Sequence, residues 1–142
     1  MRILGIDFGE KRIGLAVSDL LGLTAQGLET IRVQNREQFL NDLSKICSDQ
    51  NIREIVIGLP VNMNGSLGPK AQEILKLVPA MEERLHLPVK TWDERLTSRQ
   101  AGRLMIEEGL SRKKQKETSD RLAATILLQN YLESKRKSLN ES

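Results

Sequence analysis

The spacing of hydrophobic residues in this chain first changes near residue 35, and this change restricts the possible fold more than any other feature. Before it, β-forming apolar runs cover Arg2–Phe8 and Arg12–Ser18, and the three residues Gly9-Glu10-Lys11 between them are short enough for a hairpin. A third run covers Ala25–Val33, after a second turn at Asp19–Gly22. The first part of the chain is therefore predicted to be a meander of three antiparallel strands.

After this point helical and strand patterns alternate. Apolar residues recur at helical spacing from Arg36 to Asp49, and Pro69 suits the first position of a helix that runs to about Leu85. Pro79 lies inside that second helix and lacks a backbone donor, so a kink or break is expected there. The remaining predicted elements are two short strands, a third helix and a final helix: Glu54–Gly58, Val89–Trp92, Thr97 to Gly109, and a helix that opens near Asp120.

This order predicts an α/β fold with a five-stranded mixed sheet, in which three antiparallel strands are followed by two parallel ones and helices cover both faces. A length of 142 residues suits a single domain. We expect that domain to cover residues 1–134 and a polar C-terminal tail to cover residues 135–142. The carboxyl ends of parallel strands meet at one edge of such a sheet, so a functional site is expected at that edge.

Composition permits some classes of function and argues against others. The chain has 22 basic and 19 acidic residues, and a net charge of +3 allows a polyanionic partner. Aromatic residues make up only 3%, which argues against the stacking platforms of single-strand binders. The one cysteine, Cys47, follows a helical apolar pattern and is predicted to be a buried thiol, so no disulfide is expected. With no leader segment or membrane-length apolar run, we expect a cytoplasmic protein.

Three acidic positions stand where predicted strands end or a helix begins. Asp7 ends the first strand, Asp93-Glu94 follows the fifth, and Asp120 opens the last helix. These dispersed carboxylates could converge on one Mg²⁺ site, because Mg²⁺ prefers carboxylate oxygens. For Asp120, an N-terminal capping role is an equally good interpretation.

Metal-activated water is the chemistry that this residue set supports. Two Mg²⁺ ions can polarise a phosphorus atom, activate water and stabilise the leaving oxygen of a phosphodiester. No serine, histidine and acid constellation is visible, and His86 beside Leu87-Pro88 is more typical of a solvated turn than of a general base. The composition does not distinguish Mg²⁺ from Mn²⁺.

Basic residues supply possible phosphate contacts near two of the acids. A cationic loop is predicted just before Asp120, and three arginines recur every four residues after Glu94. Solvated charged faces are the alternative explanation, but the adjacency of these residues to two of the three acids favours substrate contact. In the loop from Leu59 to Gly68, Asn62 or Asn64 could approach a substrate backbone, or the loop could be a plain connector. The basic positions are Arg112, Lys113, Lys114 and Lys116 in the loop, and Arg95, Arg99 and Arg103 on the predicted helix.

Several motifs in a fixed order give the chain a resemblance to the YqgF (RuvX) family of RNase H-like nucleases. The resemblance covers nearly the whole chain, and the order and spacing of the motifs are more specific than any one of them. The motifs are Asp7-Phe8-Gly9-Glu10-Lys11-Arg12-Ile13-Gly14-Leu15-Ala16, Gly58-Leu59-Pro60, Asn64-Gly65, Asp93-Glu94-Arg95-Leu96-Thr97 and Asp120-Arg121-Leu122-Ala123-Ala124.

The resemblance implies an RNase H-like fold and a metal-dependent nuclease that matures the 5′ end of pre-16S ribosomal RNA. It places the catalytic, metal-binding acids on Asp7, Glu94 and Asp120, with Asp93 as the runner-up to Glu94. The related RuvC resolvases carry an acid at the end of the fourth strand, where this chain has Gly58-Leu59-Pro60. The implied nucleic-acid contacts are Lys11, Arg12, Asn64, Arg95, Arg99, Arg112, Lys113, Lys114 and Lys116.

Other functions remain open at this level. An older family label, Holliday-junction resolvase, implies branched DNA as the substrate and a two-fold dimer for symmetric cleavage. An RNase H-like domain can also bind nucleic acid without cutting it, for example on a pre-ribosomal particle. An Asp-X-Gly strand end is found in actin-like and sugar-kinase ATPases too, but those folds need two lobes and this chain provides one.

Overall fold

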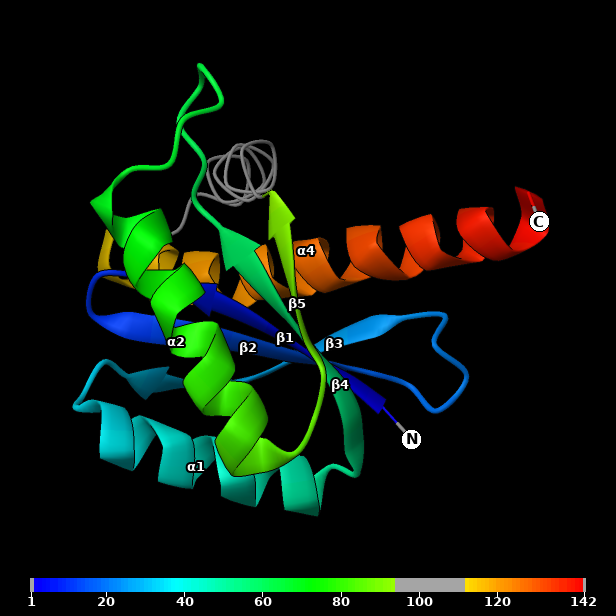
Figure 1. Ribbon diagram of the computed structural model, residues 1–142, viewed down its shortest axis with the longest axis horizontal. Helices are drawn as coiled ribbons and strands as arrows, with labels where there is room; N and C mark the ends of the chain where they lie inside the picture. Colours follow the sequence, from blue (N-terminus) through cyan, green and yellow to red (C-terminus); the bar gives the residue numbers. More distant parts are fainter. Residues whose placement is uncertain (1, 94–111, 142) are drawn as a thin grey trace.

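A five-stranded mixed sheet forms the centre of the molecule in the computed structural model (Figure 1). The structure describes residues 2–93 and 112–141, with side chains described over residues 2–93 and 121–136. The strand order is β3-β2-β1-β4-β5. The elements are β1 (Arg2–Phe8), β2 (Arg12–Ser18), β3 (Ala25–Arg32), α1 (Arg36–Asp49), β4 (Ile52–Leu59), α2 (Pro69–Leu85), β5 (Val89–Asp93) and α4 (Arg112–Glu141).

The pairing of the strands confirms the predicted topology. β1, β2 and β3 form an antiparallel meander, and β1, β4 and β5 are parallel. The turn between β2 and β3 is held by the Asp19 carboxylate, which accepts hydrogen bonds from the backbone N–H groups of Leu23 at 2.7 Å and Thr24 at 3.1 Å. These bonds lower the pKa of Asp19, and the bond from Thr24 has the larger effect. The predicted turn at Asp19–Gly22 is thus present, with Gly22 at φ +70°.

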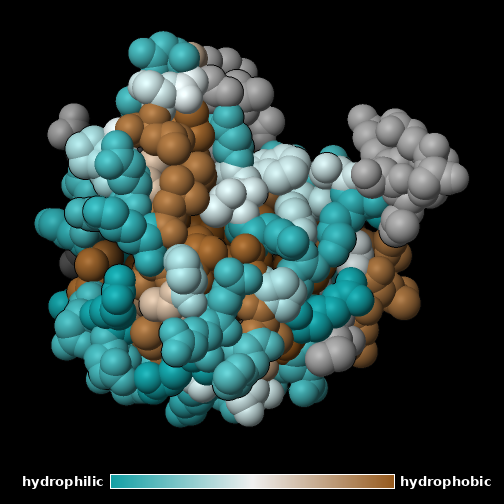
Figure 2. All heavy atoms as spheres, in the orientation of Figure 1, coloured by the Kyte–Doolittle hydropathy of each residue, from teal (hydrophilic) through white to brown (hydrophobic). Residues whose placement is uncertain are grey.

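Two apolar cores lie on the two faces of the sheet. α1 and α2 cover one face, and α4 crosses the other (Figure 1). Figure 2 shows mainly hydrophilic residues over the α1–α2 side, with a band of hydrophobic residues through its upper half. Cys47 is buried in the α1–α2 core as predicted, and burial raises the pKa of its thiol to about 11. No helix in the described ranges is long and apolar enough to cross a membrane.

Successive residues of β1 point to alternate faces, and this alternation decides which core each one joins. Leu4 and Ile6 belong to the α1–α2 core, whereas Ile3 belongs to the α4 core. Gly5 also faces α4, because a Cβ added there would lie 3.0 Å from Leu128 Cβ. The absent side chain at Gly5 lets the helix approach the centre of the sheet closely.

α4 differs from the expected final helix at both ends. It begins at Arg112, so Asp120 lies eight residues after its first residue and the capping interpretation of Asp120 is wrong. The segment from Arg112 to Lys116, predicted as a cationic loop, is helical. At the other end the helix continues to Glu141, so residues 135–141 extend it where a frayed tail was expected. The predicted helix from Thr97 to Gly109 lies outside the described residues.

The expected break at Pro79 is absent, because α2 runs from Pro69 to Leu85 as one helix. Pro79 is exposed, and Leu75, whose carbonyl loses its helical donor, is 37% exposed. Water can satisfy that carbonyl on the solvent side of the helix, so the proline is tolerated. α2 ends at His86, which adopts a left-handed conformation with φ 54° and is exposed, as the turn interpretation predicted.

A polar contact fastens the C-terminal half of α4 to the start of β4. The buried Glu54 carboxylate accepts hydrogen bonds from the Tyr131 hydroxyl and, at 2.7 Å, from Lys135 Nζ. Burial alone would raise the pKa of Glu54, but the bonds from Lys135 and Tyr131 outweigh it and hold that pKa below its ordinary value. The Tyr131 ring also packs edge-on against Trp92 of β5, with the ring centroids 5.8 Å apart.

We expect the contribution of Glu54 to stability to disappear in acid. Its pKa is lower in the folded chain than its ordinary 4.5, so the stabilisation is present above about that pH and is lost as the pH falls through the folded-state pKa. Hydrogen bonds to charged groups contribute about 2 kcal/mol. The Glu54→Gln variant should therefore unfold at lower urea concentration than wild type at neutral pH, and the gap should close in acid. A gap that stays constant with pH would contradict this role.

Candidate metal and nucleic-acid site

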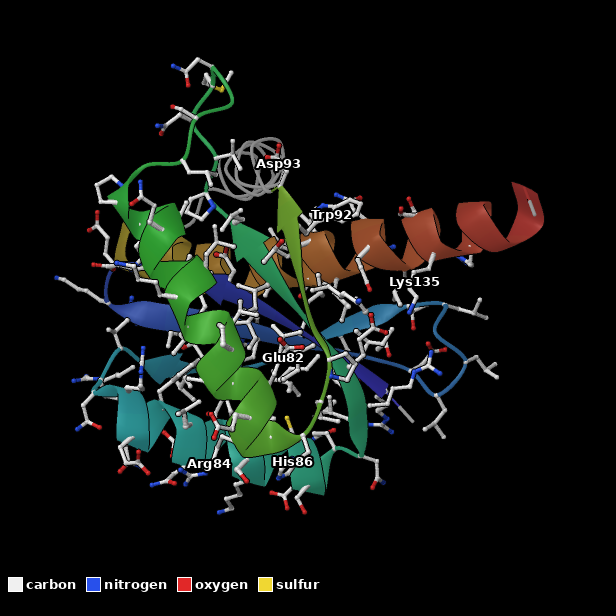
Figure 3. All side chains as sticks on the ribbon, in the orientation of Figure 1. Glu82, Arg84, His86, Trp92, Asp93 and Lys135 are labelled. Atoms are coloured by element: carbon white, nitrogen blue, oxygen red, sulfur yellow. The ribbon has the colours of Figure 1, made fainter. Side chains whose placement is uncertain are left out.

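The carboxyl ends of β1, β4 and β5 lie at the same edge of the sheet, because these strands are parallel. β1 ends with Asp7-Phe8, β4 ends at Leu59 and β5 ends at Asp93. Gly58 pairs with Trp92, and Leu59 pairs with Asp93. Figure 3 shows Trp92 and Asp93 at the tip of β5. The predicted convergence of strand ends is therefore present in the fold.

Asp7 is the most constrained acid at this edge. Its residue is 8% exposed, and it follows Ile3 and Gly5 on the face of the sheet that α4 covers. In the described part of the chain, no donor hydrogen-bonds to its carboxylate and no cation pairs with it. A buried carboxylate without such partners is costly. An oxygen-seeking divalent cation is the kind of group that would offset this cost, so Asp7 fits a metal ligand.

The direction of α4 brings Asp120 towards Asp7. A Cβ added at Gly5 would lie next to Leu128, and it would be 3.4 Å from the backbone oxygen of Ala124. Further along α4, Tyr131 reaches Glu54 at the start of β4, so the helix runs opposite to β1. One turn before Ala124 is Asp120, about 6 Å back along the helix. Asp7 lies about 6.6 Å beyond Gly5 in the same direction.

Asp93 and Asp7 lie on opposite faces of the sheet. Asp93 pairs with Leu59, which belongs to the α1–α2 core, whereas Trp92 packs in the α4 core on the side of Asp7. The alternation of strand side chains therefore disfavours Asp93 as a ligand of the metal that Asp7 would hold. Glu94, the preferred second ligand, lies outside the described residues. Among the residues that are described, no group of three or more metal-binding side chains comes together.

The predicted basic contacts are placed only in part. Lys11 is exposed in the turn between β1 and β2, and Arg12 begins β2 beside it. Arg112, Lys113, Lys114 and Lys116 occupy the first turns of α4. Arg95, Arg99 and Arg103 lie outside the described residues.

The segment from Leu59 to Gly68 forms a small hairpin-like loop of its own. Val61 and Leu67 form an isolated β-bridge, and the N–H of Asn62 donates a hydrogen bond across the loop to the carbonyl oxygen of Ser66 at 3.0 Å. Asn64 accepts hydrogen bonds through its side-chain oxygen from the N–H of Ser66 at 3.0 Å and from its hydroxyl at 2.6 Å. Asn64 thus shapes the loop, and its contact with substrate stays a prediction.

Three further cations lie at this edge although no sequence motif marked them. Arg32 ends β3, Arg36 begins α1 and Lys70 follows Pro69 in α2. Arg32 lines a hollow with Lys11 and Arg12, whereas Arg36 and Lys70 line a pocket with Phe8. Each cation is alone in its own stretch of sequence. Only the folding of the sheet brings them together, so local patterns could not have found them.

Comparisons with known proteins agree with this architecture. Thermus thermophilus RuvC, in a structure with a Holliday junction substrate, aligns with a TM-score of 0.58 and 18% identity, covering 96% of each chain. The fowlpox virus resolvase bound to Holliday junction DNA aligns with a TM-score of 0.57 and 14% identity, covering 94% of this chain and 98% of the other. At such identities the likeness concerns the fold, which is RNase H-like.

Sequence comparison is more specific. A protein of Clostridium kluyveri named "Putative pre-16S rRNA nuclease" is 49% identical over 133 residues, 94% of this chain and 97% of its own length. A protein of Clostridium acetobutylicum with the same name is 48% identical over 134 residues, 94% of this chain and 99% of its own. Residues 1–134 match the family model RuvX, described as Holliday junction resolvase. The chain therefore belongs to the RuvX (YqgF) family of nucleases.

Proposed function

We propose that this chain is a metal-dependent endonuclease that cuts structured nucleic acid at the sheet edge formed by β1, β4 and β5. The observation that carries the proposal is the buried Asp7 carboxylate, which has no counter-charge among the described residues. We assign the metal ligands to Asp7, Glu94 and Asp120. Asp7 sits on the central strand, which fixes its position, and α4 brings the backbone of Asp120 towards it.

In this proposal β1, the bound metal ion and the nearby cations have different roles. β1 holds the Asp7 oxygens at a fixed place, so little reorganisation is needed when a phosphate arrives. Bound Mg²⁺ or Mn²⁺ would supply an activated water and stabilise charge on the phosphate and the leaving oxygen. Lys11 and Arg12, next to the end of β1, would hold substrate phosphates by charge in this proposal.

The substrate we favour is the 5′ end of pre-16S ribosomal RNA, because the relatives that align over nearly their whole length carry that name. Branched DNA is the second candidate, since the family description and two structural neighbours name Holliday junctions. The deciding experiment incubates the chain with labelled pre-16S leader RNA and with a four-way DNA junction, with Mg²⁺ or with EDTA. Metal-dependent cuts in one substrate name the target. Binding without cleavage of either would favour a noncatalytic module.

We expect the start of α4 to contribute to the salt dependence of RNA binding. Neutralising Arg112, Lys113, Lys114 and Lys116 together to glutamine should weaken binding and reduce the slope of log affinity against log salt by up to about 3. The matched control neutralises four exposed cations elsewhere, which are Lys45, Lys76, Lys90 and Arg136. Equal slopes for wild type and the α4 variant would remove this segment from the interface.

A further inference from the structure

An apolar pocket opens at the same end of β1 as Asp7, on the opposite face of the sheet. It lies between the end of β1, the start of α1 and the first half of α2. Figure 1 shows α1 and α2 on the same side of the sheet. Its apolar lining includes Phe8, Phe39 and Ile74, and its charged lining includes Arg36 and Lys70. Phe39 and Ile74 are each 3% exposed, so they form the floor of the pocket.

The pocket has the size and lining for one flat aromatic group. Its volume is about 220 Å³, and an apolar cavity of about 150 Å³ is enough to hold a benzene ring. The rings of Phe8 and Phe39 lie 5.5 Å apart and tilted by 55°, so they offer both a face and an edge to a guest. The Glu73 carboxylate in the lining can accept hydrogen bonds from an amino group.

A positively charged hollow adjoins this pocket. Lys11, Arg12 and Arg32 line the hollow with Glu10, and Val33 lines both the hollow and the pocket. The two linings together contain five cations and two acids, Glu10 and Glu73. Within the described part of the chain, neither Arg36 nor Lys70 takes part in an ion pair. The surroundings of the pocket therefore suit a polyanion more than an apolar peptide.

We propose that this pocket receives one unpaired nucleobase of the strand that is cut at the Asp7 edge. The inference rests on the proposed nuclease function and adds a binding site to it. Phe8 follows Asp7 directly and points to the other face of the sheet. A nucleic-acid strand that bends over the edge of the sheet can therefore present a phosphate to Asp7 and a nearby base to the pocket. Arg36, Lys70 and the hollow then hold the flanking phosphates.

The test is a base-deletion scan of binding in EDTA, where no metal-dependent cutting occurs. The probe is a fluorescein-labelled RNA hairpin with a single-stranded overhang, in which one position at a time is abasic and the duplex fixes the register. For wild type we expect one position at which loss of the base weakens binding about tenfold, the effect of losing a base that stacks. Leu77 lines the pocket, so Leu77→Phe should fill it. In this variant, loss of the base at that position should no longer weaken binding.

Charge variants and a folding check complete the test. Arg36→Ala with Lys70→Ala should weaken binding of the intact probe several-fold, whereas Lys45→Ala with Lys76→Ala removes one exposed cation from each of the same helices and should not. Thermal melting checks folding, and Val33→Trp, at the exposed rim of the pocket, replaces Leu77→Phe if that variant melts early.

Three results would overturn the inference. They are equal losses of binding at every abasic position, a position-specific loss that persists in Leu77→Phe, and displacement of the labelled probe by AMP as readily as by the unlabelled overhang. The last would mean a mononucleotide site. Because every arm measures binding without metal, these outcomes are independent of whether the chain cuts nucleic acid. Cleavage without a base-specific position would defeat the pocket alone, and a base-specific position without cleavage would defeat the nuclease proposal alone.

Discussion

Asp7→Asn is expected to lower the cleavage rate by at least about a hundredfold while the chain stays folded, because a neutral amide cannot replace a carboxylate in holding a divalent cation. Its effect on stability should have the opposite sign. Asp7 is buried without a counter-charge among the described residues, so removing its charge should leave the free energy of unfolding unchanged or raise it. An acid kept for structure would show the reverse pattern.

Asp49→Asn is the matched control for this substitution. Asp49 is exposed at the end of α1, just before β4 begins, and therefore at the opposite edge of the sheet from Asp7. We expect its cleavage rate to equal that of wild type. Rates are measured as initial velocities on the substrate that wild type cuts, and stability by urea unfolding. An Asp7→Asn enzyme with wild-type velocity would exclude Asp7 from the site.

Leu128→Ala is expected to cost about 3 kcal/mol of stability, the largest effect we predict for folding. Leu128 is fully buried in the α4 core and touches the position where Gly5 leaves room for the helix. The alanine would leave a cavity between α4 and the centre of the sheet, which the close approach of the two prevents from collapsing. For a domain of this size the midpoint of thermal unfolding should fall by about 10 °C.

Leu21→Ala removes the same atoms from a different environment. Leu21 is 80% exposed at the tip of the turn between β2 and β3, so its loss should change stability by less than about 0.5 kcal/mol. Both variants are compared with wild type by urea and thermal unfolding. Similar losses for the two leucines would mean that the packing of α4 on Gly5 contributes little to the fold.

Features set by local sequence were predicted well. The meander follows from two short turns between alternating runs, and the Asp19 side chain closes the second turn as its position indicates. The mixed sheet follows from the order of elements, because a helix between two strands allows them to be parallel. The position of Asp7 was also predicted, because an acid near the end of a parallel strand lies at the edge where sites form, whereas its role as a metal ligand stays a prediction.

The predictions that failed concern helices, whose ends and interruptions depend on their surroundings. A break at Pro79 was a reasonable expectation, but Pro79 lies on the exposed side of α2, where water can replace the lost donor. The start of α4 could not be placed from apolar spacing, because residues 112–120 are all polar and offer no hydrophobic period to follow. Lys135 was assigned to a tail, yet its amino group reaches Glu54, which is 81 residues earlier in the chain.

The pocket lining lay beyond any pattern in the sequence. Phe8, Phe39 and Ile74 come from β1, α1 and α2, and each reads as an ordinary core residue in its own segment. The same holds for Arg36 and Lys70, which look like isolated surface cations. Their meaning depends on which helix ends meet beside the end of β1, and that is a property of the tertiary structure.

The most direct test of the central claim is a titration of the chain with Mn²⁺, followed by electron paramagnetic resonance of the free ion. We predict binding by wild type and by Asp49→Asn, and at least about tenfold weaker binding by Asp7→Asn. The result should accompany the loss of cleavage in the same variant. Equal Mn²⁺ affinity in wild type and Asp7→Asn would contradict the metal site at the end of β1.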